Sequence, residues 1–178
     1  MELQKNQLNN IQLIVGLGNP GVKYHYNRHN LGFLLLDKYI SIQNLKWSFS
    51  TKLNGDYVKA NSHIYLKPHT YMNNSGSSVS KALSYFCLNP YELFVVHDDV
   101  DLPFGEVRVR FGSGAAGHNG VKDIFTHLGT QDFWRLRFGV GRSNHLNVPT
   151  DKHVLTDFTQ NELDYISDID FESYINKT

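Results

Sequence analysis

The stretch that decides the fold is Leu13–Phe33, which has the sequence LIVGLGNPGVKYHYNRHNLGF. It opens within an apolar run over residues 11–17, and such a run is typical of a buried strand. A glycine-rich turn follows over residues 16–21, where glycine allows unusual backbone angles and proline fixes one. We therefore expect Asn19 to be held rigidly at the carboxyl end of a strand, which is where open α/β sheets place their ligands.

Arg28, His29 and Asn30 come directly before a helical pattern that begins at Leu31. Asn30 is a favourable N-cap residue, so we expect His29 to lie just outside a helix N-terminus. The positive end of that helix and the charge of Arg28 both oppose protonation, which predicts a neutral, basic His29. A rigid Asn19 and a neutral His29 that face one crevice indicate a hydrolytic site.

Two other interpretations of this stretch are open. Residues 16–21 match the pattern G-x-G-x-x-G, and Asp37 lies at a suitable distance for a ribose contact, as in dinucleotide-binding proteins. Pro20 argues against that class because it removes a backbone N–H that would bind the pyrophosphate. His25 and His29 are four residues apart and would share a metal on a helix, but the flanking glycine and asparagine predict a loop here.

The composition is that of one globular domain over residues 1–178, with 40% hydrophobic and 19% charged residues. A single cysteine, Cys87, excludes a disulfide framework and a cysteine-based metal site. The polar segment 1–9 has no signal-peptide pattern and is expected to be loosely held. No apolar run approaches the length of a membrane span, so we expect a cytoplasmic protein.

Charge is unevenly distributed along the chain. The totals are 17 basic and 17 acidic residues, but residues 1–142 hold 15 and 10 of them, and residues 143–178 hold 2 and 7. A basic body with an acidic tail is compatible with a nucleic-acid partner, although the net charge of zero disfavours one. Thr159 and Glu162 form a capping-box pattern that predicts an acidic C-terminal helix over about residues 160–175.

Alternating patterns over residues 47–60 and 63–66 predict a strand pair that turns at Asn61-Ser62. A polar and aromatic segment over residues 70–76 leads into the next predicted helix. It contains Asn73, for which a turn or cap role is the simpler explanation from sequence.

The apolar run Leu93–Val96 predicts a central parallel strand, and Asp98 follows it closely. Three carboxylates at this strand end indicate either a metal site or an oriented general base. The absence of histidine or glutamate at a metal-ligand spacing favours the second. If this strand is a parallel neighbour of the first, Asp98 shares a crevice with Asn19 and His29, where it would fix the histidine tautomer.

Two further strands carry alternating arginines. Residues 107–111 place Arg108 and Arg110 on one exposed face, and residues 133–140 present Arg135 and Arg137 with the same spacing. Paired arginines on two strands indicate a phosphate-binding patch. Solvated strand faces are the alternative.

Five motifs in order, GLGNPGxxYxxxRHNxG, TYMNNSG, HDDVDLPFG, GHNGVKDI and RLRFGVGR, resemble those of bacterial peptidyl-tRNA hydrolases. The resemblance covers about residues 11–165. It implies an α/β fold, with a mixed twisted sheet sandwiched between helices in a single three-layer domain. It also implies a monomeric, cofactor-free and metal-independent enzyme. Such an enzyme cleaves the ester between a peptide and the terminal adenosine of tRNA, and its partner is peptidyl-tRNA.

The resemblance also implies roles for individual residues. His29 matches the catalytic histidine, Asp98 the aspartate that stabilises its basic form, and Asn19 the residue that senses the blocked amino group. The positions matching substrate contacts, or lying beside them, are Tyr24, Tyr71, Met72, Asn73, His118 and Asn119. The positions matching phosphate-binding residues are Arg108, Arg110 and Arg137.

Two departures from the family pattern stand out. Ala116 occupies a position where glycine is usual, which predicts a stiffer or differently placed loop. Relatives commonly continue beyond the acidic last helix, so the way in which this tail meets tRNA is open. A non-catalytic RNA-binding relative is the remaining alternative, but it would have no reason to keep both His29 and Asp98.

Overall fold

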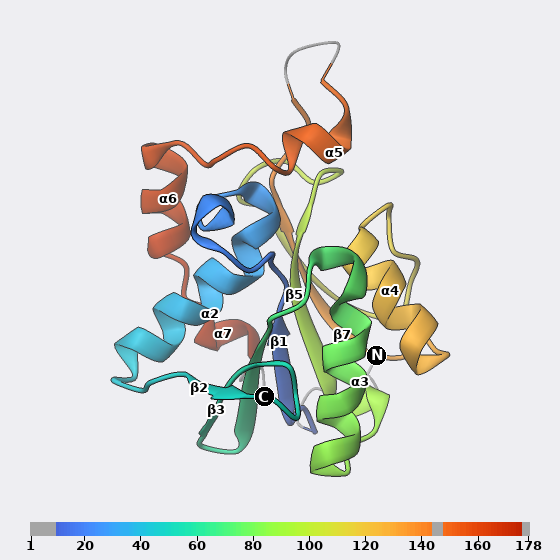
Figure 1. Ribbon diagram of the computed structural model, residues 1–178. Coiled ribbons are helices and arrows are strands. Elements are labelled where there is room, and N and C mark those ends of the chain that lie inside the picture. The colour runs from blue at the N-terminus through green and yellow to red at the C-terminus, as the bar shows by residue number, and fades with distance from the viewer. Residues whose placement is uncertain (1–9, 144–147, 176–178) are drawn as a thin grey trace.

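The computed structural model describes residues 10–143 and 148–175. A twisted sheet lies in the middle, with α2, α6 and α7 on one side and α3 and α4 on the other (Figure 1). This three-layer α/β arrangement is the predicted fold class. The expectation for residues 1–9 concerns a segment outside the described residues.

The described residues form a seven-stranded sheet in the order β2-β3-β4-β1-β5-β7-β6. β1 is parallel to both β4 and β5, and β5 is parallel to β7. β2, β3 and β6 join antiparallel at the two edges, so the sheet is mixed as expected. The strand bounds are β1 Leu13–Gly16, β2 Ser48–Ser50, β3 Gly55–Ala60, β4 His63–Pro68, β5 Leu93–Asp99, β6 Val107–Phe111 and β7 Trp134–Gly139.

The helices connect the strands and cover both faces of the sheet. The α-helices are α2 Leu31–Ile42, α3 Ser75–Phe86, α4 Asn119–Leu128, α5 Thr150–His153, α6 Gln160–Ser167 and α7 Glu172–Ile175. Four short 3-10 helices are η1 Val22–Tyr24, η2 Arg28–Asn30, η3 Met72–Asn74 and η4 Pro90–Glu92.

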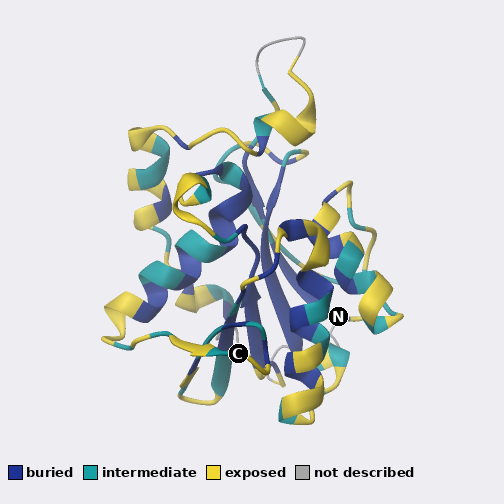
Figure 2. Ribbon diagram, in the orientation of Figure 1, coloured by how far each residue is buried: buried dark blue, intermediate teal, exposed yellow. Residues whose placement is uncertain are grey.

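Two apolar cores result, one on each face of the sheet (Figure 2). One packs β-strand side chains against α2 and the C-terminal helices and includes Leu35, Phe94 and Ile166. The other packs the opposite face against α3 and α4 and includes Val79 and Ile124. Strands between two helical layers are buried on both faces, which explains the continuous apolar runs in β1 and β5.

Glycine allows α2 to approach the end of β1 closely. A Cβ on Gly16 would lie 2.4 Å from the carbonyl oxygen of Gly32, and one on Gly32 would lie 2.3 Å from the nitrogen of Leu17. Only Gly21 in this turn needs a left-handed backbone, with φ of 110°. Most of the glycine requirement in the opening stretch is therefore steric, and it brings the segment before α2 against the carboxyl ends of the strands.

Two predicted elements differ in extent from the structure, and one helix of the structure was not predicted. The segment 47–60 is two strands, β2 and β3, with a turn between them, while the hairpin at Asn61-Ser62 is as predicted. The C-terminal helix predicted over 160–175 is broken into α6 and α7, because Asp168 caps the first of them. The short α5 was not predicted. No helix in residues 10–143 or 148–175 is long and apolar enough to cross a membrane.

Candidate active site

The carboxyl ends of β1 and β5 lie side by side and define the candidate site. Asp98 was expected just after the strand but lies within it, because β5 continues through residues 97–99 and pairs with β7 there. All seven residues of β5 are buried. Polar side chains are tolerated at such positions when hydrogen bonds satisfy them, and Asp98 has these bonds.

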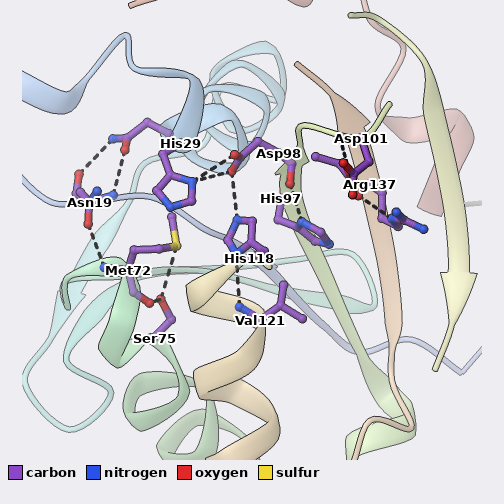
Figure 3. A network of polar contacts seen from close by, with 12 residues as sticks. Asn19, His29, Met72, Ser75, His97, Asp98, Asp101, His118, Val121 and Arg137 are labelled. Atoms are coloured by element: carbon purple, nitrogen blue, oxygen red, sulfur yellow. Dashed lines mark hydrogen bonds and ion pairs between the residues drawn. The ribbon is translucent and has the colours of Figure 1, made fainter. Parts of the chain in front are cut away.

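Asp98 lies between two histidines (Figure 3). Nδ1 of His29 is 2.9 Å and 3.0 Å from the two carboxylate oxygens, and Nε2 of His118 is 3.0 Å from one of them. The backbone N–H of Val121 donates to Nδ1 of His118 at 3.3 Å, so the proton of His118 is on Nε2. An ionised carboxylate only accepts, so the proton of neutral His29 is on Nδ1 and its Nε2 carries a lone pair.

The electrostatics of this network favour a charged Asp98 beside neutral histidines. Burial opposes the ionisation of Asp98, but the two histidines outweigh it and hold the pKa of its carboxyl far below the usual range. Burial lowers the pKa of His118, which therefore stays neutral. Burial also acts to lower the pKa of His29, but the charge and hydrogen bond of Asp98 outweigh it and raise the pKa above 6.5.

The predicted direction of the pKa shift of His29 was wrong, and Arg28 does not act on His29 as expected. The guanidinium of Arg28 forms an ion pair with Glu162 of α6, with Nη2 at 2.8 Å and 2.9 Å from the two carboxylate oxygens. Its charge is therefore compensated locally. Asp98 sets the pKa of His29 in the direction opposite to the one predicted, and it makes His29 a stronger base.

Asn30 occupies the N-cap position of α2 but makes no side-chain capping bond there. Its amide instead bonds the backbone of Asn19 twice, donating to the carbonyl oxygen and accepting from the N–H, both at 2.9 Å. Oδ1 of Asn19 in turn accepts from the backbone N–H of Met72 at 2.8 Å. Asn19 is thus rigid, as predicted, and its Nδ2 makes no hydrogen bond with any residue that the structure describes.

His29, Asp98 and His118 are also the group within the described residues whose donor atoms lie close enough to suggest a metal site. The two nitrogens that face Asp98 carry protons and donate them, so both are already in use. A metal here would have to displace both protons. The pattern His25–His29 does not form a site either, because these residues lie in separate 3-10 turns.

A crevice of about 390 Å³ opens beside His29. Its lining includes Asn119 from the start of α4 and Ala116 from the preceding loop. Ala116 has φ of 47°, a left-handed angle that costs an L-residue about 1–2 kcal/mol, which shows why glycine suits this position. Thr150, Asp151 and Val154 also line the crevice, and the sequence pattern gave no signal for them.

The remaining predicted contacts are at the rim near Asn19. Tyr71 is 59% exposed, and its ring lies edge-on to that of Tyr24 with 6.4 Å between centroids. Asn73 is exposed in η3, beside the buried Met72. His118, expected beside the substrate contacts, lines the crevice together with Asn119. It is also buried, caps α4 and hydrogen-bonds to Asp98. The sequence did not predict that His118 would hydrogen-bond to Asp98.

The arginines do not form one uniform patch. Arg110 and Arg108 are exposed on β6, as predicted, and Arg108 pairs with Glu106. Arg137 is partly buried and its Nε donates to Asp99 at 2.7 Å. Arg135 is fully buried and its guanidinium donates to the carbonyl oxygens of Gly112, Ser113 and Gly114. It holds a loop in place and cannot reach a phosphate.

The dinucleotide interpretation does not fit the structure. The glycine turn leads into η1 and η2 and not directly into a helix whose N-terminus would bind a pyrophosphate. Asp37 lies within α2, where Lys67 of β4 binds it.

Comparisons with known proteins show which family the chain resembles. The family model described as Peptidyl-tRNA hydrolase matches residues 13–174. Peptidyl-tRNA hydrolases of Citrifermentans bemidjiense and Prochlorococcus marinus are 44% and 42% identical over 89% and 90% of this chain, and over 85% and 82% of their own. The crystal structure of an Arg119Gln mutant of peptidyl-tRNA hydrolase from Acinetobacter baumannii has a TM-score of 0.82 at 35% identity, covering 88% of this chain and 81% of that one.

Fold, site and relatives together define a hydrolase. The chain belongs to the peptidyl-tRNA hydrolase family. Its function is hydrolysis of the ester that joins a peptide to the terminal adenosine of tRNA, which recycles the tRNA for translation.

Proposed function

We propose that His29 is the general base of this hydrolysis and that water is the nucleophile. The observation that carries the proposal is the arrangement of His29, Asp98 and His118, which leaves Nε2 of His29 without a hydrogen-bond partner among the described residues. Nε2 removes a proton from a water molecule as that water attacks the ester carbonyl. The tetrahedral intermediate then collapses, the bond from the acyl carbon to the ribose oxygen breaks, and the imidazolium returns its proton to that leaving oxygen. Asp98 stabilises the imidazolium that forms, and His118 holds Asp98. A general base of this kind contributes about 10² to 10⁴-fold to the rate.

The oxyanion that develops on the carbonyl needs hydrogen-bond donors. Asn73 and Asn119 are exposed side chains near the candidate site, one in η3 and one at the start of α4. Their amides donate to the oxyanion or position the water, and the loss of one such donor costs about 10² to 10³-fold in kcat. Neither step needs a metal. Nδ1 of His29 and Nε2 of His118 serve as hydrogen-bond donors to Asp98. We place this reaction in the cytoplasm, where translation supplies the substrate.

The experiment that tests the function compares two substrates. The protein is incubated with N-acetylated aminoacyl-tRNA and with free aminoacyl-tRNA, and the deacylation of each is measured with and without EDTA. We expect rapid release from the blocked substrate only, unaffected by EDTA. Equal rates on both, or a loss of activity on chelation, would contradict the proposal.

Asn19 is the proposed sensor of the blocked amino group, because its Oδ1 accepts from Met72 while its Nδ2 has no hydrogen-bond partner among residues 10–143 and 148–175. Asn19→Asp keeps an oxygen that accepts from the N–H of Met72, but it replaces the free donor with a charged acceptor. We expect the ratio of the two deacylation rates to fall about tenfold, since one hydrogen bond to substrate is lost. The matched control is Asn61→Asp in the distant hairpin turn. An unchanged ratio in folded Asn19→Asp would remove this role.

Arg110 is the best placed of the three candidate arginines to bind tRNA phosphate, since Arg108 and Arg137 have carboxylate partners. Arg110→Ala should raise KM for full tRNA substrates and reduce the salt slope by about 0.9, because one counterion fewer is released. It should leave kcat nearly unchanged, since binding remote from the ester is equal in the ground and transition states.

The control for Arg110→Ala is Lys81→Ala, which removes an exposed positive charge from α3. A second control is a peptide ester of adenosine, which has no tRNA phosphates and should not respond to either change. Equal losses by Arg110→Ala on both substrates would mean that Arg110 shapes the crevice and does not bind tRNA.

A further inference from the structure

The turn that carries His29 is bonded along its length to a distant part of the chain, residues 154–162, which we term the strap. The N–H of His29 donates to the carbonyl oxygen of Val154 at 2.8 Å, and the N–H of Arg28 donates to that of Thr156 at 3.0 Å. The N–H of Phe158 donates to the carbonyl oxygen of Tyr26 at 2.9 Å. The strap therefore runs beside the turn from residue 26 to residue 29.

Side chains add to these backbone bonds, and Arg28 makes most of them. Its guanidinium binds both carboxylate oxygens of Glu162, donates to the carbonyl oxygen of Asp157, and lies 5.1 Å from the ring centroid of Phe158. The side chains of Arg28 and Glu162 are only 11% and 20% exposed. Nη2 makes both contacts to Glu162, and Nη1 donates to Asp157, so the guanidinium is held at two places on residues 154–162. A partly buried pair held in this way is more strongly oriented than an exposed single-contact pair.

The turn has little internal structure to hold its shape. η2 is a single three-residue 3-10 helix, and the side chain of Asn30 at its end hydrogen-bonds to the backbone of Asn19. The position of the His29 ring therefore depends on its bond to Asp98 and on the strap. A general base must be held to within about 0.5 Å of its productive position. Loosening the strap should therefore displace Nε2 of His29 from that position.

We propose that Arg28 and Glu162 are positioning residues for His29, whose ion pair fixes the strap against the turn and so holds Nε2 in the geometry for proton removal. This inference rests on the proposed role of His29 as the base. It gives the strap a part in the chemistry, although its charged side chains, Asp157 and Glu162, do not line the crevice. It also explains why the arginine next to the catalytic histidine points away from the crevice.

The test uses Arg28→Met, Arg28→Lys and Glu162→Gln in the full chain, assayed on an N-acetylaminoacyl ester of adenosine. This substrate has no tRNA phosphates, so changes of protein charge do not alter its attraction. Glu162→Gln is chosen because the oxygen of glutamine still accepts from Thr159 and preserves the capping box of α6. The matched control is Asp164→Asn, which removes the same charge from the same helix. Its carboxylate accepts from Gln160 and from no other side chain in the described part of the protein.

We expect kcat to fall between about 10- and 100-fold in Arg28→Met and Glu162→Gln, with KM within twofold of the parent. Arg28→Lys should recover part of the loss, and Asp164→Asn should match the parent. A purely structural role would lower the melting temperature and leave kcat of the folded fraction unchanged. If Arg28→Met does not fold, the kcat of Glu162→Gln alone tests the positioning role.

A kcat within threefold of the parent in folded Glu162→Gln, or an equal loss in Asp164→Asn, overturns the positioning role. His29→Ala is measured in the same assay to separate the two proposals. If His29→Ala is inactive while the Arg28 and Glu162 variants keep their kcat, only the positioning role fails. If His29→Ala is itself active, the assignment of the base fails and the positioning role falls with it.

Discussion

His29→Ala should lower kcat on N-acetylaminoacyl-tRNA by about 10² to 10⁴-fold and leave tRNA binding unchanged. The side chain is buried, but among the residues that the structure describes it hydrogen-bonds only to Asp98, which keeps His118 as a second partner. The substitution therefore removes the proton acceptor without leaving the carboxylate unpaired, so the protein should fold. Single-turnover rates and tRNA binding, measured on the same preparation, separate chemistry from affinity.

The matched control for this substitution is His25→Ala. His25 is exposed on the same segment, four residues earlier, and it is the residue that a helical metal site would have needed. It should retain full activity. Parent-like turnover by folded His29→Ala would show that another group accepts the proton, and a loss in His25→Ala as large as that in His29→Ala would revive a shared role for the two histidines.

The position of the site could be predicted from sequence because it follows from strand order. Apolar runs identified β1 and β5, and the carboxyl ends of parallel neighbours meet at one edge of a sheet. That was sufficient to bring Asn19, His29 and Asp98 together. The family resemblance added the rim residues Tyr71 and Asn73, which no periodicity would have distinguished from ordinary turn residues.

Hydrogen-bond partners could not be predicted in the same way. Asn30 has the residue type of a helix cap, and its sequence position fits one, but its amide binds Asn19 because the turn brings that backbone closer. Arg28 next to His29 in sequence suggested a charge effect that Glu162, 134 residues away, removes. Long-range partners of this kind decide pKa values, and local sequence does not contain them.

Strands β6 and β7, which carry the alternating arginines, show a similar limit to what a sequence pattern can predict. Alternation correctly placed Arg108 and Arg110 on an exposed face of β6. The same alternation in β7 gave no sign that Arg135 would be buried, because burial there depends on the loop 112–114 folding back over it. Periodicity assigns a side chain to a face of the sheet, whereas the packing of other segments decides whether that face is open.

Asp98→Asn tests the centre of the network, and we expect it to lower kcat by about 10² to 10⁴-fold in a folded protein. An amide offers one acceptor and one donor where the carboxylate offers two acceptors. His118 keeps its proton on Nε2, because its Nδ1 accepts from Val121, and it therefore takes the amide oxygen. The amide NH₂ then faces Nδ1 of His29 and favours the tautomer with the proton on Nε2, which cannot act as the base.

The pH dependence of Asp98→Asn gives a second, independent readout. In the parent, Asp98 raises the pKa of His29 above 6.5, so activity should be lost as the pH falls through that raised value. Without the carboxylate charge, burial of His29 dominates and lowers its pKa, so the acidic limb of the residual activity should move to lower pH. The matched control is Asp56→Asn, which breaks an aspartate–histidine pair with His69 whose members do not line the crevice, and it should change neither kcat nor the limb. An acidic limb that stays in place in Asp98→Asn would show that Asp98 does not set the basicity of His29.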